Sequence, residues 1–356
     1  MPNTKFQNKL QSVLDNNRAF VSYRWPNSKA LEVIVQNDDT LYYSKNLDTK
    51  GFVFAPFSQR GKTIIFPFDK AQYSTYDLTD SIPENNNSRA EYNTHNSSLS
   101  KEKYIDLVEK AVKVINSGAI DKVVLSRRIS INLKNIKLAK LFNRLLLKYP
   151  NACVYLWHHP KVGTWLGATP EKLLNIEDNK LSTMALAGTQ ISNKDDVSWD
   201  AKERNEQQWV TDFITDTLTQ IAIPIKISKP YNLKAGRLWH ICTDILGKVP
   251  NDVSLDEIVK ALHPTPAVAG LPKQKSIDFI LANEAYNRSF YTGFLGVINQ
   301  QKEGERYSKL FVNLRCMQIE DQKVYIYVGG GITKDSHPLS EWDETEAKSK
   351  TLLEVL

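Results

Sequence analysis

Short runs of β-branched and aromatic residues recur along the whole chain, and they constrain its fold more than any other feature of the sequence. Such runs are typical of β-strands. They lie at residues 20–25, 31–36, 51–57, 62–68, 122–131, 152–159, 164–176, 180–188, 237–249, 309–319 and 323–332. Helical patterns interrupt them without the regular strand–helix alternation of a parallel sheet. The sequence therefore predicts an α+β fold with mostly antiparallel sheets.

The helical patterns have recognisable ends. Over 101–118 apolar residues recur every three or four positions until Gly118, which is a typical stop signal. A capping box opens a second helix over 254–262. The segment 340–348, "SEWDETEAK", predicts the start of the last helix, with Ser340 as its N-cap.

The composition is that of a soluble globular protein, with 41% hydrophobic and 24% charged residues. No apolar run approaches the ~20 residues that cross a bilayer, and the amino terminus lacks the apolar core of a signal peptide. The three cysteines are widely separated, which argues against a disulfide framework and a zinc knuckle. We expect a cytoplasmic protein without a membrane or nucleic-acid partner, because the net charge of +6 is small and dispersed. A small anionic substrate suits this charge equally well.

Two Glu-x-x-Glu pairs stand near predicted helix starts, Glu203 with Glu206 and Glu341 with Glu344. Acids at helix starts commonly do no more than complement the helix dipole. If the two helix starts converge, however, their carboxylates form an all-oxygen site that suits Mg²⁺. The spacing alone leaves both interpretations open.

Three further features have a structural and a functional interpretation. The glycines of "VGGGI", 328–332, are typical of a turn or bulge, or else they expose backbone N–H groups to an anion. Lys122 begins a very apolar run, and Glu171 lies in another. Each is unremarkable alone, but together they could act as a base and an acid whose pKa values are pushed apart.

These features belong to a longer ordered series that resembles the chorismate-utilising enzymes, and within them isochorismate synthase. The series is "DKVVLSR", "WLGATPEKLL", "ALAGT", "KERNEQ", "LWH", "LHPTPAVAG", "YTGFLG", "NLRC", "GGGI" and "SEWDETEAK". The resemblance implies a single catalytic domain over 1–356, with a large antiparallel sheet assembly around a deep cleft. Residues 1–100 are its divergent amino-terminal part, with a polar, poorly ordered loop near 83–100, and 101–356 carry the motifs.

The resemblance also implies a reaction, in which chorismate becomes isochorismate with Mg²⁺ as the required cofactor. Lys122 would be the base that activates water, and Glu171 the acid that protonates the departing C4 hydroxyl. Glu206 and Glu341 would hold the metal, with Glu203 and Glu344 beside it. The substrate would be bound by residues from several motifs: Gly188, Thr189, His240, Ala267, Val268, Tyr291, Arg315, Gly329 and Lys348.

Other members of the family remain as alternatives. Anthranilate and aminodeoxychorismate synthases use ammonia and lack the base lysine, so Lys122 favours water and no glutaminase subunit is expected. Salicylate synthases keep that lysine but carry a motif like "HPSITASG" where this chain has "HPTPAVAG". A catalytically silent chorismate-binding protein is the third possibility. We expect a monomer, with the stretch 189–202 shorter than usual, and the resemblance leaves menaquinone and siderophore pathways both open.

Overall fold

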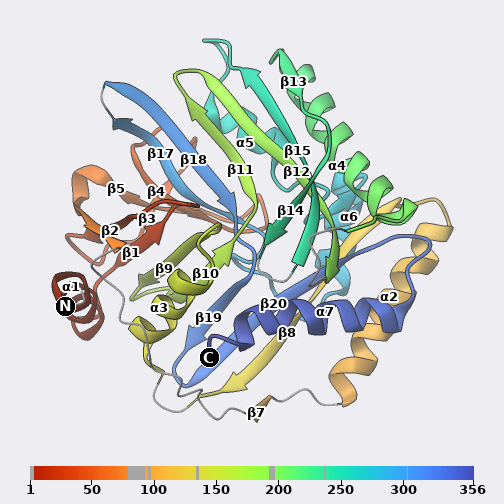
Figure 1. Ribbon diagram of the computed structural model, residues 1–356, viewed down its shortest axis with the longest axis horizontal. Helices are drawn as coiled ribbons and strands as arrows, with labels where there is room; N and C mark the ends of the chain where they lie inside the picture. The colour runs from red at the N-terminus through yellow and green to blue at the C-terminus, as the bar shows by residue number, and fades with distance from the viewer. Residues whose placement is uncertain are drawn as a thin grey trace.

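The computed structural model describes residues 4–78, 93–94, 98–133, 136–191, 197–235, 238–302 and 304–356. Most of the polar segment at 83–100 and the middle of the 189–202 stretch lie outside the described residues. Within them, all strand pairings are antiparallel and fall into two ten-stranded sheets. Figure 1 shows these sheets with helices around them. The α+β prediction is confirmed.

The first sheet carries the strand that begins with Lys122. Its strands, in spatial order, are β16 (Gly270–Leu271), β8 (Lys122–Asn132), β20 (Lys323–Ile332), β19 (Cys316–Glu320), β10 (Gly163–Thr169), β9 (Cys153–His159), β1 (Phe20–Arg24), β2 (Ala30–Gln36) and β6 (Ala71–Asp77). Strand β7 (Asn93–Thr94) pairs with β8 off this path.

The second sheet is built from the remaining strands. In spatial order they are β13 (Ile225–Ile227), β15 (Leu238–Lys248), β12 (Lys180–Ile191), β11 (Lys172–Glu177), β18 (Glu305–Val312), β17 (Phe294–Lys302), β4 (Gly51–Ala55), β5 (Thr63–Pro67) and β3 (Tyr42–Ser44). Strand β14 (Tyr231–Ala235) pairs with β15 off this path.

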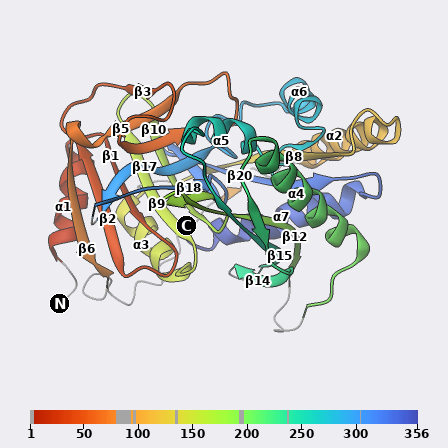
Figure 2. The same ribbon diagram turned by 90° about the horizontal axis from the view of Figure 1, so that it is seen from above.

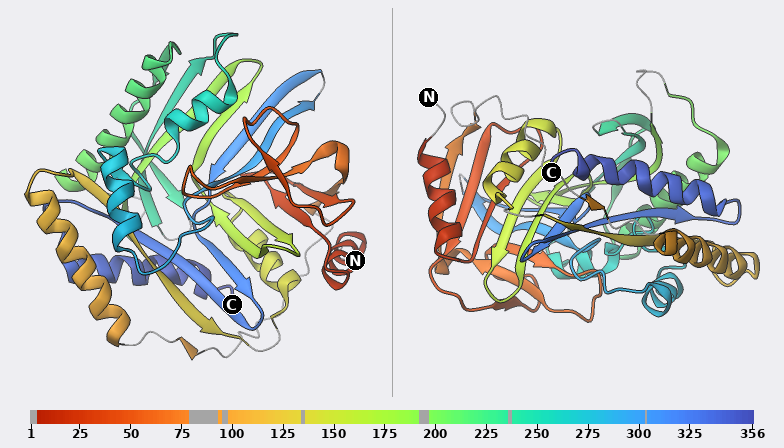
Figure 3. Two further views of the ribbon diagram at one scale, coloured as in Figure 1. Left: turned by 180° about the vertical axis from the view of Figure 1, so that it is seen from behind. Right: turned by 90° about the horizontal axis from the view of Figure 1, so that it is seen from below.

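The helices lie outside the sheets. They are α1 (Thr4–Asp15), α2 (Ser98–Asn116), α3 (Leu138–Lys148), α4 (Ala201–Gln220), α5 (Leu255–Leu262), α6 (Lys273–Asn283) and α7 (Pro338–Leu353), with a 3₁₀ turn at Phe68–Lys70. In Figure 2, α1 lies at one end of the molecule and α2, α4 and α6 lie at the other. Figure 3 shows α7 running alongside β8 and β20. No helix within the described ranges has both the length and the apolar character needed to cross a membrane.

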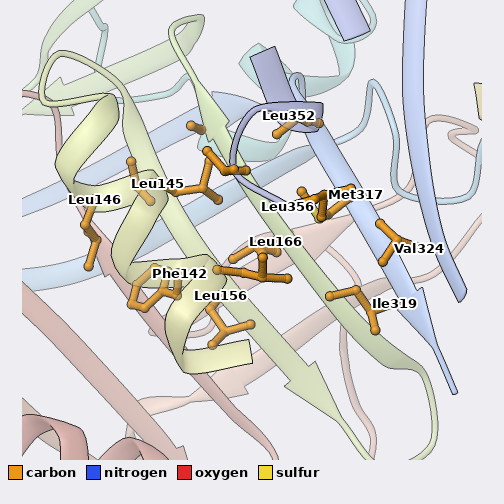
Figure 4. Close-up of a cluster of buried hydrophobic side chains, with 14 of the residues drawn as sticks. Phe142, Leu145, Leu146, Leu156, Leu166, Met317, Ile319, Val324, Leu352 and Leu356 are labelled. Atoms are coloured by element: carbon orange, nitrogen blue, oxygen red, sulfur yellow. The ribbon is translucent and has the colours of Figure 1, made fainter. Parts of the chain in front are cut away.

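Aromatic side chains join the two sheets. Phe54 of the second sheet stacks on Phe290 at 4.3 Å between ring centroids and meets Trp157 of the first sheet at 4.8 Å. On another face of the first sheet, α3 and the end of α7 cover a cluster that includes Phe142, Leu156 and Leu166 (Figure 4). Each large apolar side chain buried in this way contributes about 1.5–3 kcal/mol to stability.

One prediction about the last helix is wrong, and one of the two interpretations of the "VGGGI" glycines is excluded. The helix α7 begins at Pro338, with His337 as N-cap, so Ser340 lies inside the helix. Proline suits the first helical turn, because its missing N–H would have no partner there. The "VGGGI" glycines lie within β20, where Gly330 pairs with Leu125 of β8, and they do not form a turn.

Candidate active site

A cavity of about 130 Å³ lies where the two sheets meet helices α4 and α7. Thirteen of the fifteen predicted site residues line it, and they come from β12, β15, α4, β20, α7 and the connecting segments. They are Glu171, Gly188, Thr189, Glu203, Glu206, His240, Ala267, Val268, Tyr291, Arg315, Gly329, Glu344 and Lys348. The other two, Lys122 and Glu341, are buried directly behind lining residues, to which they are ion-paired.

Lys122 is buried at the start of β8, with no exposed side-chain surface. Its Nζ lies 2.7 Å from Oε1 of Glu206. The backbone around it is fixed, since the Lys122 carbonyl accepts a hydrogen bond from Ser276 Oγ at 2.9 Å. Gly270 packs so closely that a Cβ there would lie 2.1 Å from that carbonyl oxygen. The fold therefore holds this lysine against the cavity wall, with a carboxylate as its counter-ion.

Glu171 lies in the break between β10 and β11, directly after Pro170. Its backbone N–H donates to Thr169 Oγ1 at 3.3 Å, and its carbonyl accepts from the Val312 N–H at 3.0 Å. Burial raises the pKa of Glu171 to about 7, although Lys122 and Arg315 act in the opposite direction. This direction agrees with the expectation that the apolar setting favours the protonated acid, and the role of Glu171 as the acid stays a prediction.

Three carboxylates of the two Glu-x-x-Glu pairs converge on the glycines of β20, and Glu203 lies beside Gly188 of β12. A Cβ on Gly331 would lie 2.4 Å from Oε1 of Glu206, and one on Gly330 would lie 3.3 Å from Oε2 of Glu341 and 3.7 Å from Oε1 of Glu344. The helix starts of α4 and α7 therefore face the same strand, over a hundred residues apart in the chain. Side chains at these two glycine positions would displace the carboxylates, which explains why this stretch is glycine.

Each of three carboxylates takes a lysine as its counter-ion. Besides the Lys122 pair, Lys202 Nζ lies 2.9 Å from Glu341 and Lys348 Nζ lies 2.6 Å from Glu344. Burial lowers the pKa of Lys202, but the neighbouring carboxylates of Glu341, Glu344 and Glu206 outweigh it and leave the pKa raised.

The acids have spare coordinating capacity. The Oε2 atoms of Glu203 and Glu341 are buried without a hydrogen-bond partner among the described residues, and such oxygens are the donors that Mg²⁺ prefers. Across the same ranges, no group of three or more His, Cys, Asp or Glu side chains is arranged so as to hold a metal ion. The donor set fits magnesium in its chemistry, and a cation bound there would take over the role of the lysine partners.

His240 and Arg315 form the cationic side of the cavity. His240 Nδ1 lies 2.8 Å from the Gly188 carbonyl, so this nitrogen carries the proton, and Nε2 accepts from Arg315 Nη2 at 2.7 Å. Burial and the Arg315 charge lower the pKa of His240 to about 3, which keeps the ring neutral. Burial also lowers the pKa of Arg315 to about 10. The neutral imidazole orients the guanidinium toward the cavity without repelling it.

The remaining predicted residues complete the walls. Lys348 Nζ donates to the Gly329 carbonyl at 3.0 Å, and Thr189 Oγ1 lies 3.4 Å from His240 Nδ1. Ala267 and Val268 supply an apolar surface.

The sequence reasoning missed two lining residues with a clear role. Lys202 directly precedes Glu203 in "KERNEQ", four residues before Glu206, and this spacing could have identified it as a third lysine of the cluster, beside Lys122 and Lys348. Tyr327, whose ring lies 5.3 Å from that of Tyr291, is the other. In the sequence, Tyr327 cannot be distinguished from the other aromatic residues of the predicted strands.

Comparisons with known proteins agree with this geometry. The family model described as "Chorismate binding enzyme" matches residues 59–356, so the chain belongs to the chorismate binding enzymes. The isochorismate synthase EntC of Escherichia coli is 31% identical over 262 residues, which are 70% of this chain and 66% of that protein. The isochorismate synthase MenF of Haemophilus influenzae is 30% identical over 71% of this chain and 60% of that protein. The chain thus aligns with slightly less than two thirds of these relatives.

Solved structures share the fold. DhbC from Bacillus anthracis superposes with a TM-score of 0.79 at 22% identity, covering 98% of this chain and 99% of that one. The menaquinone-specific isochorismate synthase MenF from Escherichia coli gives a TM-score of 0.77 at 23% identity, covering 94% and 88%.

Proposed function

We propose that the protein is an isochorismate synthase that converts chorismate to isochorismate in the cytoplasm. The observation that carries this proposal is the placement of a buried lysine, Lys122, and a glutamic acid with a pKa of about 7, Glu171, at one cavity. The relatives named isochorismate synthase support it. The three cysteines are buried and unpaired, which fits a reducing compartment.

The formal charges of the cavity also support a dianionic substrate. Five carboxyl groups face four cationic side chains: Lys122, Lys202, Lys348 and Arg315. With Glu171 protonated, four negative charges balance four positive ones. With Lys122 deprotonated so that it can act as the base, a site that also holds Mg²⁺ would carry a net charge of +1, which attracts the anionic chorismate.

We assign the metal to Glu206 and Glu341, with Glu203 and Glu344 beside it. When bound, Mg²⁺ supplies positive charge for a substrate carboxylate. Arg315 binds the other carboxylate, because its planar guanidinium offers two parallel N–H donors and His240 already fixes its orientation.

The reaction then needs one base and one acid. Neutral Lys122 takes a proton from the water that bonds to C2, the ring double bonds shift, and the C4–O bond breaks. Glu171 gives its proton to the departing hydroxyl, which leaves as water, so the atoms and protons balance. The proton then returns from Lys122 to Glu171 before the next turnover. Ala267 and Val268 offer no group that could assist pyruvate elimination, which favours isochorismate over salicylate as the product.

The test is incubation with chorismate and Mg²⁺, followed by chromatography of the products and a coupled pyruvate assay. Isochorismate without pyruvate is expected. Salicylate with pyruvate would instead identify a salicylate synthase, and unchanged chorismate a silent binding protein. Lys122→Ala and Glu171→Gln should each lower kcat by about 10²–10⁴-fold while chorismate binding stays measurable. An exposed control, Lys323→Ala, should keep full turnover, and normal turnover in the Lys122 variant would remove the proposed base.

A further inference from the structure

A second cavity lies apart from the candidate active site and shares no lining residue with it. Its volume is about 480 Å³, against about 130 Å³ for the active-site cavity on the same measure. Strand β3, the connection between β4 and β5, helix α5 and the first residue of β17 form its walls. This space is large enough for a small organic molecule.

The walls combine apolar surface with positive charge. The apolar part includes Leu47, Val259 and Phe294. Three lysines supply the positive charge: Lys45, Lys62 and Lys260. A single lining carboxylate, Asp256, opposes them among the described residues, and it is paired with Lys260 at 2.6 Å. The remaining charge is positive, which favours an anion.

A buried histidine lines the same cavity. His263 is 2% exposed and lines the cavity. Burial and then the charge of Lys273 lower the pKa of His263 to about 3, although backbone hydrogen bonds with Pro56 and Phe57 act in the opposite direction. The ring is therefore neutral and carries one N–H donor and one acceptor. Neither nitrogen makes a hydrogen bond of good geometry within the described residues, so the ring is available to a ligand that offers a better partner.

Two segments connect this cavity with the active site. His263 lines the second cavity, whereas Ala267 and Val268, a few residues further on, line the first. Likewise Phe294 lines the second cavity and Tyr291 lines the first. The rings of His263 and Phe294 meet edge to face with 5.1 Å between their centroids, so the two segments are in contact.

We propose that this cavity is a second ligand site, which binds a small aromatic monocarboxylate. Lys45 and Lys62 neutralise its carboxylate, His263 provides a hydrogen bond, and Phe294 packs against its ring. Lys62 Nζ already lies 5.1 Å from the centre of the Tyr43 ring at the same wall. A ligand bound in this cavity contacts His263 and Phe294, whose segments also line the active site. The inference does not depend on which reaction the active site catalyses.

The test is titration of the full chain with benzoate, followed by calorimetry and by saturation-transfer NMR. Benzamide serves as the neutral analogue and inorganic phosphate as the anion without an apolar body. Benzoate should bind at least about tenfold more tightly than either, because it alone satisfies both the charge and the apolar wall. Equal binding of benzamide or of phosphate, or no binding of benzoate, would overturn the proposal.

Variants locate the bound benzoate. Lys45→Gln combined with Lys62→Gln should weaken binding about tenfold, and His263→Phe, which keeps the ring contact, should weaken it too. Lys323→Gln, at an exposed position on β20, is the matched control and should bind as the wild type does. Arg315→Lys tests the active site as the alternative location. Binding that is lost in the Arg315 variant but kept in the double lysine variant would overturn the second site.

Discussion

Glu171 gives the sharpest quantitative prediction, because its burial has opposite consequences for catalysis and for stability. Its pKa is raised from 4.5 to about 7 by burial. Between these two pH values the folded protein keeps a proton that the unfolded chain has already lost. Stability therefore falls as pH rises from 4.5 to 7 and levels off above 7. The Glu171→Gln substitution removes this loss, since an amide does not ionise.

The magnitude follows from the two pKa values. Each pKa unit corresponds to about 1.4 kcal/mol, and a single site with these values loses about 2–3 kcal/mol between pH 5 and pH 8. The difference in free energy of unfolding between Glu171→Gln and the wild type should therefore shift by about 2–3 kcal/mol in favour of the variant over that range. Glu171→Gln should therefore be more stable and less active than the wild type, because the proton that Glu171 keeps is the one that the reaction uses.

Urea denaturation at pH 5, 6, 7 and 8 measures this difference directly. Glu109→Gln, at an exposed position of α2, controls for the loss of one carboxylate. In parallel, the turnover of the wild type should fall above about pH 7, as the acid loses its proton. A stability difference that does not change with pH would show that Glu171 ionises as it does in the unfolded chain, and would refute its assignment as the acid.

Three further predictions concern the neighbouring groups. Gly331→Ala should lower kcat more than a hundredfold, because the new Cβ would lie 2.4 Å from a carboxylate oxygen of Glu206; steady-state kinetics measures this, and a fully active variant would contradict the packing. Glu341→Gln should raise the Mg²⁺ concentration needed for half-maximal turnover at least tenfold, and an unchanged requirement would exclude it as a ligand. Arg288→Met should destabilise the protein by about 3–5 kcal/mol, because it leaves the buried Glu284 without its partner at 2.6 Å; urea denaturation should show this loss, and a change below about 1 kcal/mol would contradict it.

The sequence predicts the strands and the fold class well, because the two-residue period of a half-buried strand is a local property. It predicts helix faces less accurately. On α2 the apolar pattern indicates a stripe through four residues: Ile105, Val108, Val112 and Ile115. Val108 and Ile115 are buried, whereas Ile105 and Val112 are only partly buried and Tyr104 and Ala111 are buried in addition. Which neighbours of a stripe become buried depends on β8 and α7, which pack against this helix from distant parts of the chain.

The site shows the same division between local and long-range information. The two Glu-x-x-Glu pairs are visible in the sequence, and the ordered motifs predict that they meet. Their counter-ions are of both kinds. Lys348 lies four residues after Glu344 on the same helix, whereas Lys202 reaches Glu341 across a separation of 139 residues, so that this pairing is not visible in the sequence. The need for glycine in β20 cannot be predicted locally either, because the carboxylates that leave no room for a side chain there approach from α4 and α7.

The counter-ions also explain how a buried cluster of acids is compatible with a stable fold before any cation arrives. Four carboxylates gathered at one cavity would repel one another strongly in a medium of low polarity. Lys122, Lys202 and Lys348 each take one of three carboxylates at 2.6–2.9 Å, which removes most of that repulsion. A divalent cation bound there would take over this role, and Lys202 and Lys348 would then be able to pair with an anionic substrate. The binding of cation and substrate should therefore reinforce each other.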